Sequence, residues 1–426
     1  MNFRSLKSVF PYPHTLAAVG LLACGVAPLT AQPHTGDPEE SFAPEGYALA
    51  WEDGFNGHQL DHDKWFYRNG IDRGRTIMSR DNVVLDHGHL NLVVQSGDFR
   101  INRETYPYYN GERDKFNYVG AGVISDWRFS LGYYEARSKM LDAHYWHPAY
   151  WLEVVNGDDD NNLLRFHNRA EIDIMECEPQ WPVAQSIRVH DWLTGGEHRK
   201  LPPRDPKTGH NMTIASDQSL GWYVWGMELT EDQAIFFENG RHVVTVDIPD
   251  DYRRDPMNII LSCVTIKEPT DSGIQKFDWV RYHEPKALRE SERKECERLI
   301  QFTSLVGPDF MDQRDAEASN GWRQRASDAK QGDFVMYRVY VNEPGEYAVR
   351  MRTFAEDDAS GAWQLAIDGE NHGEAMRAAK AAGYVEWDLG TKAFAAEGYA
   401  EFVLMCEEAD GEGATLDFDW IELVKQ

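Results

Sequence analysis

Three carboxylate side chains lie within six residues of a segment that otherwise has the composition of a buried strand, Glu171-Ile-Asp-Ile-Met-Glu176. A buried strand tolerates carboxylates only when each is paired, hydrogen-bonded or neutralised. Side chains alternate faces along a strand, so Glu171 and Asp173 share a face, whereas Glu176 would point to the opposite face of a regular strand. One extra residue in a β-bulge around Ile174 and Met175 would return Glu176 to the first face. The spacing therefore predicts a bulged strand that brings three acids together in a cleft.

Converging carboxylates favour acid–base and nucleophilic chemistry. Two carboxylates about 5–5.5 Å apart can cleave a glycosidic bond with retention, because one attacks the anomeric carbon while the other protonates the leaving oxygen. Asp173, between them, would tune both neighbours, since a like charge disfavours ionisation. One alternative is a solvated acidic strand, in which polar and apolar residues should alternate more regularly. Another is a metal site. Calcium would prefer loop carboxylates such as those in Asp158-Asp-Asp-Asn-Asn162.

The remaining sequence predicts an all-β protein. From Trp51 to Tyr282, short β-branched and aromatic runs are separated by Gly, Asn, Asp and Pro. This pattern is typical of a many-stranded β-sandwich, here a jelly roll whose concave cleft could hold a polymer chain. Residues 287–301 are rich in Glu, Arg and Leu with helical spacing and predict a short helical connector. Residues 302–426 return to strand-like runs, which predict a second, smaller β-sandwich after a first domain at 46–286.

The segment Glu171–Glu176 resembles the catalytic strand of glycoside hydrolase family 16 in its bulged form, E-x-D-x-x-E. Further segments resemble that family's motifs in the same order over about residues 46–286. They are Asp53-Gly-Phe-Asn-Gly57, Gly132-Tyr-Tyr-Glu-Ala-Arg137, Pro148-Ala-Tyr-Trp-Leu152, Tyr223-Val-Trp-Gly-Met-Glu228, Phe236-Phe-Glu-Asn-Gly240 and Phe277-Asp-Trp-Val-Arg-Tyr282. The resemblance implies an endo-acting, retaining glycoside hydrolase with Glu171 as nucleophile, Glu176 as acid/base and Asp173 as helper. It leaves open a transglycosylase and a sugar-binding protein on the same fold, although the three acids argue against the latter.

The C-terminal region, residues 302–426, resembles a family 6 carbohydrate-binding module. Its candidate ligand aromatics are Trp363, Tyr384 and Trp387, and the alternative is that these rings belong to the core.

The substrate is expected to be a polysaccharide. Although the net charge is -28, arginines crowd the segments before and around the catalytic strand, and guanidinium groups bind sulfate or carboxylate bidentately. This favours a marine algal galactan of the porphyran, carrageenan or agar type. If the arginines instead form surface ion pairs, a β-1,3-glucan of the laminarin type is the alternative. The expected substrate contacts are Trp146, Trp151, Arg73, Arg75, Arg188, His190 and Trp192.

Residues 1–31 have the pattern of a signal peptide, with Arg4 and Lys7 before an apolar run, and residues 32–45 read as a linker. We expect a secreted or periplasmic protein, or an outer-membrane lipoprotein if Cys24 carries a lipid. The acidic charge argues against nucleic acid as a partner. We expect a monomer without a required cofactor, and Asp278 is the candidate ligand for a structural calcium ion. The four later cysteines match no zinc pattern, and at least Cys177 and Cys263 should be buried thiols.

Overall fold

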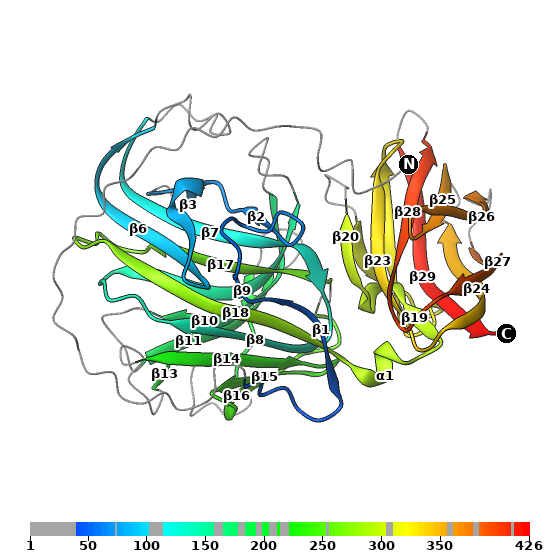
Figure 1. Ribbon diagram of the computed structural model, residues 1–426, viewed down its shortest axis with the longest axis horizontal. Helices are drawn as coiled ribbons and strands as arrows, with labels where there is room; N and C mark the ends of the chain where they lie inside the picture. The colour runs from blue at the N-terminus through cyan, green and yellow to red at the C-terminus, as the bar shows by residue number, and fades with distance from the viewer. Residues whose placement is uncertain are drawn as a thin grey trace.

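The computed structural model describes residues 40–72, 75–101, 114–156, 165–177, 184–192, 198–203, 211–213, 221–252, 255–303, 310–355, 361–377, 383–409 and 413–426. Strands dominate these ranges (Figure 1), and the described helical elements are only α1 (Lys286–Arg289) and the 3-10 turns η2 (Arg80–Asn82) and η4 (Cys296–Arg298). The all-β prediction is confirmed. None of the described helices has the length and apolar character needed to cross a membrane. The predicted signal peptide, including Cys24, lies outside the described residues.

The first sandwich has two large antiparallel layers. One layer is centred on β18, which pairs with β8, β6 and β1. Its strands are β1 (Tyr47–Asp53), β5 (Val83–Asp86), β6 (His89–Arg100), β8 (Gly132–Lys139), β14 (Trp222–Leu229), β15 (Gln233–Glu238), β16 (Arg241–Asp247) and β18 (Gly273–Pro285).

The second layer carries the acidic strand β10 between β9 and β11. Its strands are β2 (Trp65–Tyr67), β7 (Lys115–Phe129), β17 (Met257–Thr265), β9 (Trp146–Asn156), β10 (Arg165–Cys177), β11 (Ala184–Trp192), β12 (His198–Lys200) and β13 (Asn211–Thr213). The short strands β3 (Gly70–Asp72) and β4 (Thr76–Met78) extend it from β7, which also pairs with β6.

Alternation along β9 separates the two faces of this second layer. Tyr150, Leu152 and Val154 belong to the core between the layers. Ala149 and Trp151 belong to a separate small cluster with Phe66, Ile124, Val155 and Ile260. This cluster lies on the opposite face of the layer, because neighbouring residues of a strand point to opposite sides. The β9–β10 register places Asp173 opposite Trp151, so we call this face the acid face.

The connector is only partly helical. Helix α1 covers four residues, and β19 (Arg293–Glu295) and β20 (Ile300–Thr303) flank the 3-10 turn η4. The apolar spacing at Cys296 and Leu299 reflects packing into the core of the second sandwich, where both side chains are buried, and not the face of a longer helix.

The second sandwich also has two antiparallel layers. One contains β20, β23 (Phe334–Val341), β28 (Gly398–Glu408), β25 (Ala362–Ile367) and β26 (Glu370–Arg377). The other contains β21 (Phe310–Arg314), β22 (Trp322–Ala329), β29 (Ala414–Lys425), β24 (Gly345–Ala355) and β27 (Gly383–Phe394), with β19 beside β29.

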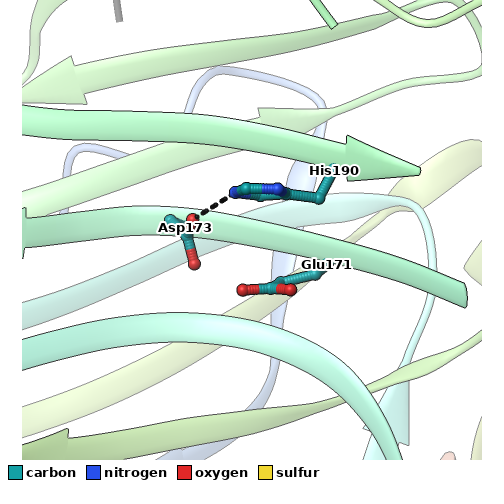
Figure 2. Close-up of side chains that lie close together, drawn as sticks. All are labelled: Glu171, Asp173 and His190. Carbon is teal, nitrogen blue, oxygen red and sulfur yellow. Dashed lines mark hydrogen bonds and ion pairs between the residues drawn. The ribbon is translucent and has the colours of Figure 1, made fainter. Parts of the chain in front are cut away.

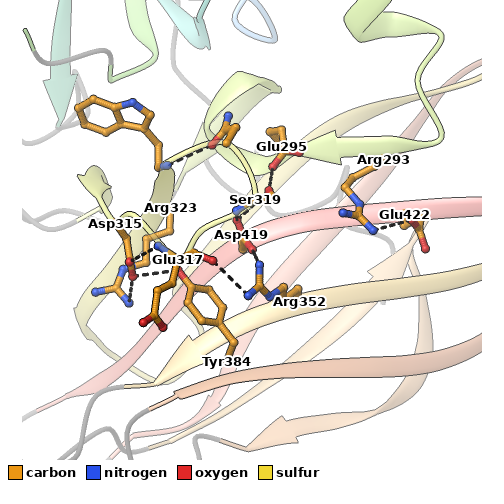
Figure 3. Close-up of polar contacts among 12 residues, drawn as sticks. Arg293, Glu295, Asp315, Glu317, Ser319, Arg323, Arg352, Tyr384, Asp419 and Glu422 are labelled. Atoms are coloured by element: carbon orange, nitrogen blue, oxygen red, sulfur yellow. Dashed lines mark hydrogen bonds and ion pairs between the residues drawn. The ribbon is translucent and has the colours of Figure 1, made fainter. Parts of the chain in front are cut away.

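The three aromatic candidates of this second sandwich differ in position. Trp363 is fully buried in the core, so it is not a ligand-binding ring. Trp387 packs against that core, and its indole N–H donates to Thr353 Oγ1. Tyr384 lies in a network of ion pairs (Figure 3), where its hydroxyl donates to Asp315 and the guanidinium of Arg352 covers its ring at 3.8 Å.

The two sandwiches meet through buried contacts. Ile300 is part of the core of the first sandwich, and Tyr399 of β28 packs against that core. Gln301 of β20 pairs with Arg128 of β7, so the strand ladder continues across the junction. The guanidinium of Arg298 lies 2.9 Å from a carboxylate oxygen of Glu231. The second sandwich is therefore packed directly on the first.

Candidate active site

The predicted β-bulge is present in β10. On the β11 side, Asp173 pairs with Arg188 and Glu176 with Ser186, so three steps on β10 match two on β11. On the β9 side, the register shifts between Asp173 and Met175. The extra residue leaves both Ile174 and Met175 buried in the core, and it returns Glu176 to the acid face.

Each of the three acids has a different polar neighbour. Glu171 is partly exposed and accepts a 2.8 Å hydrogen bond from the indole N–H of Trp192. Asp173 is only 3% exposed, and its Oδ2 lies 3.1 Å from Nε2 of His190. Glu176 is partly exposed. Its Oε1 lies 2.6 Å from Nε2 of His147, and its Oε2 lies 3.8 Å from Nε of Arg188.

Burial and like charges change the protonation of the middle acid. Burial raises the pKa of Asp173 well above its usual value, and the nearby carboxylates of Glu176 and Glu171 raise it further. Arg188 opposes this rise, but the net direction is upward. Burial, followed by the neighbouring His198 and Lys200, lowers the pKa of His190 to about 4. At neutral pH, Asp173 therefore holds a proton more readily than a typical aspartate, and His190 is neutral.

Figure 2 shows that Glu171, Asp173 and His190 also converge as possible metal ligands. One oxygen from each acid and one ring nitrogen lie within 4.8 Å of one another, the only such set within the described ranges. A divalent cation needs deprotonated carboxylates. The raised pKa of Asp173 works against that state, and Arg188 offsets the rise only in part. Asp173 and His190 instead suit proton transfer, because a neutral carboxylic acid beside a neutral imidazole can pass a proton to it.

Asp278 lies on β18 in the other layer. Its Oδ2 is hydrogen-bonded by Arg137, and its Oδ1 lies 3.7 Å from Nε2 of His89. A guanidinium on a carboxylate occupies the place of a cation, so these contacts do not fit the calcium ion expected at Asp278.

The predicted aromatic contacts divide between the two faces. Trp146 was predicted wrongly: it is completely buried in the core between the layers, and its indole N–H donates to the carbonyl of Asp271. Trp151 lies on the acid face but is 8% exposed, and its N–H donates to Ser262 Oγ. Trp192 is partly exposed, and its ring stacks on His198 with centroids 3.8 Å apart. His190 is 6% exposed, and its ring nitrogens contact Asp173 and His198.

One of the predicted basic contacts, Arg188, has an acidic partner. Arg188 lies beside Glu176, and its Nε donates to Ser186 Oγ. Arg199, a further basic residue of this region, is paired with Asp191 and lies 3.2 Å from Asp251. Arg75 is exposed, whereas Arg73 lies outside the described residues.

Two residues of the site were not assigned their roles from the sequence. His147 directly precedes Pro148 and is four residues from Trp151, so strand alternation alone would have placed it on the acid face. His198 follows β11 after an intervening segment, and only the pairing of Trp192 with His198 brings it to the site. The alternation of side chains in the sequence does not predict the contact of His198 with the site.

Comparison with known proteins gives distant matches. No family model matches the chain. The glucan endo-1,3-beta-glucosidase A1 of Niallia circulans is 24% identical over 210 residues. The match covers 46% of this chain and 29% of that protein, so the chain spans less than a third of the relative's length.

Similar solved structures include the laminarinase catalytic domain from Thermotoga maritima, with 15% identity and a TM-score of 0.44 over 56% of this chain and 99% of that chain. The endo-beta-1,3-glucanase from Pyrococcus furiosus has 18% identity and a TM-score of 0.43 over 56% of this chain and 94% of that chain. A structure described with the endo-acting O-glycanases of the human gut microbiota has 20% identity and a TM-score of 0.46 over 57% of this chain and 92% of that chain.

Proposed function

We propose that this protein is an endo-acting, retaining β-glycosidase of the glycoside hydrolase family 16 type. The observation that carries the proposal is the bulge in β10, which places Glu171, Asp173 and Glu176 on one face although their spacing would separate them. A strand with no catalytic task gains nothing from a bulge that exposes a third acid beside two others, whereas bulges recur next to active sites.

Glu171 acts as the nucleophile in this proposal. The N–H of Trp192 binds one of its oxygens and fixes the orientation of the carboxylate. An oxygen of Glu171 attacks the anomeric carbon while Glu176 gives its proton to the leaving glycosidic oxygen. The product is a glycosyl ester on Glu171, and the sugar chain on the other side of the cleaved bond leaves with a new hydroxyl group.

Glu176 then acts as the base. It takes a proton from water, the hydroxide attacks the anomeric carbon, and Glu171 leaves as a free carboxylate with net retention. His147 and Arg188 hold the two oxygens of Glu176 in position. Asp173 lies between Glu171 and Glu176 and holds a proton, which limits the repulsion among the three clustered acids.

For the substrate, we place a β-1,3-glucan of the laminarin type first. Arg188 and Arg199 have acidic partners within the protein, which reduces their capacity to bind sulfate. The curated relative is a glucan endo-1,3-beta-glucosidase, which agrees with this choice. A sulfated galactan is the second candidate, because Arg75 is exposed and Arg188 lies at the acid face. Export through residues 1–31 would bring the enzyme to either polymer.

Reducing-end release from a panel of polysaccharides tests the proposal. The panel contains laminarin, lichenan, agarose, porphyran, kappa-carrageenan and furcellaran. We expect the wild type to cut at least one of them, and Glu171→Ala and Glu176→Ala each to lose about 10²- to 10⁴-fold in rate with an unchanged thermal unfolding midpoint. Asp173→Asn should be slowed and not eliminated. Glu346→Ala, an exposed site on the second sandwich, is the control and should match the wild type.

Near-normal activity of either glutamate variant would remove the mechanism. Product lengths over time separate hydrolysis from transglycosylation, because a transferase forms chains longer than its substrate.

A further inference from the structure

We infer that His190 and His198 form a proton relay that connects Asp173 with solvent at the β11–β12 edge of the layer. The relay would let Asp173 exchange its proton while a polymer covers the acid face. The inference rests on the proposed function for its purpose, but its geometry can be tested independently. His190 and His198 act through Asp173 and are not themselves expected to touch substrate.

The three groups form a continuous chain of contacts from the interior to the surface. Nε2 of His190 lies 3.1 Å from Oδ2 of Asp173, and Nδ1 of the same ring lies 2.6 Å from Nε2 of His198. The two imidazole planes differ by 7°, so an N–H of one ring can point in plane at the lone pair of the other. Asp173 and His190 are buried, whereas His198 is exposed.

The surrounding strands hold this chain in place. The β11–β12 register places His198 opposite Trp192 and Lys200 opposite His190. The indole of Trp192 stacks face to face on His198 and at the same time donates to Glu171. One side chain therefore positions both the outer end of the relay and the proposed nucleophile.

In the relay, all three groups are neutral and one direction of proton donation runs through both contacts. Asp173 O–H donates to Nε2 of His190, Nδ1–H of His190 donates to Nε2 of His198, and Nδ1–H of His198 is the outer proton. The pKa directions agree: that of Asp173 is raised, that of His190 is lowered to about 4, and burial followed by Lys200 lowers that of His198.

Charged groups from each neighbouring strand act on this chain. Glu171 and Glu176 on β10 and Glu153 on β9 favour the protonated state of Asp173, and Arg188 on β11 opposes them. Lys200 on β12 disfavours a charged imidazole at both histidines, Arg188 adds to this at His190, and Glu176 partly offsets it there.

The changing charges of Glu171 and Glu176 give the relay a use. When Glu171 becomes a neutral glycosyl ester, Glu176 has given up its proton, so the charges beside Asp173 are rearranged while the polymer covers the acid face. To exchange its proton, Asp173 passes it to Nε2 of His190, the Nδ1 proton of His190 moves to Nε2 of His198, and the Nδ1 proton of His198 goes to water. When hydrolysis restores the charge of Glu171, one proton returns by the reverse route. Each turnover therefore restores both tautomers and leaves no net proton transfer.

Histidine ¹⁵N NMR on the full chain tests the relay without any substrate. We expect two neutral imidazoles in the Nδ1–H form, assigned by His190→Gln and His198→Gln. We also expect both resonances to move together in Asp173→Asn. Two rings that titrate independently near their ordinary pKa would overturn the inference.

Steady-state kinetics on a polymer that the wild type cuts test the role of the relay in catalysis. His198→Gln should lower kcat by about 10-fold, at the weak end of proton-transfer effects because water can partly replace the ring, with KM unchanged and an altered pH profile of kcat. Added imidazole should restore part of the kcat lost in His198→Ala. His58→Gln, an exposed histidine of the same sandwich, should behave as the wild type.

A His198→Gln variant with the wild-type kcat and pH profile would overturn the role of the relay. A wild type that cuts no polymer would instead remove the hydrolase proposal, and the NMR result alone would then decide the relay.

Discussion

At the scale of single residues, Trp192 and His190 show that predicting the strand face of a side chain does not predict what that side chain contacts. Alternation along the strand places both on the acid face, as the sequence predicts. Whether a ring there touches a sugar or a carboxylate depends on side-chain rotamers and on β12, which alternation does not report. Trp146 and Trp151 are an odd number of residues apart, so they could not both face the cleft, and counting the alternation would have assigned Trp146 to the core.

Replacing Trp192 with phenylalanine isolates its N–H group. Trp192→Phe keeps an aromatic ring against His198 but removes the donor to Glu171. A hydrogen bond to a charged group contributes about 1.5–3 kcal/mol, so kcat/KM should fall by about 10- to 100-fold. Steady-state kinetics measure this. Trp222→Phe, which changes a ring stacked on His89 in the other layer, is the matched control, and an equal loss there would remove the assigned role of Trp192.

At the scale of elements, the bulged strand was predictable because an odd spacing of acids contradicts a regular strand. The β-rich pattern with Gly and Pro breaks predicted the two sandwiches for the same kind of reason. The connector was not fully predictable. The spacing of Leu288, Cys296 and Leu299 suits a helix, but β19 and β20 gain strand partners in β29 and β23 that lie far away in sequence. Tertiary pairing of this kind outweighs local preference.

Deletion of Ile174 tests the bulge directly. Without the extra residue, β10 is a regular strand in which Glu176 lies two steps from Asp173 and stays on the acid face, so cleavage should be largely retained. Loss of the buried Ile174 side chain should lower the free energy of unfolding by about 2–5 kcal/mol. Ile174→Val keeps the bulge and should cost about 0.5–1.5 kcal/mol with activity retained. Chemical denaturation and the reducing-end assay measure both effects. A folded deletion variant that lost cleavage would show that the extra residue of the bulge is not what decides the face of Glu176.

At the scale of the whole molecule, the acid face belongs to one sandwich while the second is packed on it through Ile300, Tyr399 and the Arg298–Glu231 pair. The sequence predicted two sandwiches but not this junction, because its contacts join residues that lie far apart in the sequence. The acids, their face and their bulge were foreseeable. Alternation also places His147 and His190 on the acid face, but it does not report their contacts, and His198 reaches the site only through the pairing of β12 with β11.

The stereochemistry of cleavage tests the central claim most directly. ¹H NMR should follow the anomeric protons released by the intact protein from the first polymer that it cuts, before mutarotation mixes the anomers. The account predicts that the β-anomer appears first, because Glu171 forms a glycosyl ester that water then displaces. Initial release of the α-anomer would contradict it, since Glu171 could then not be the nucleophile.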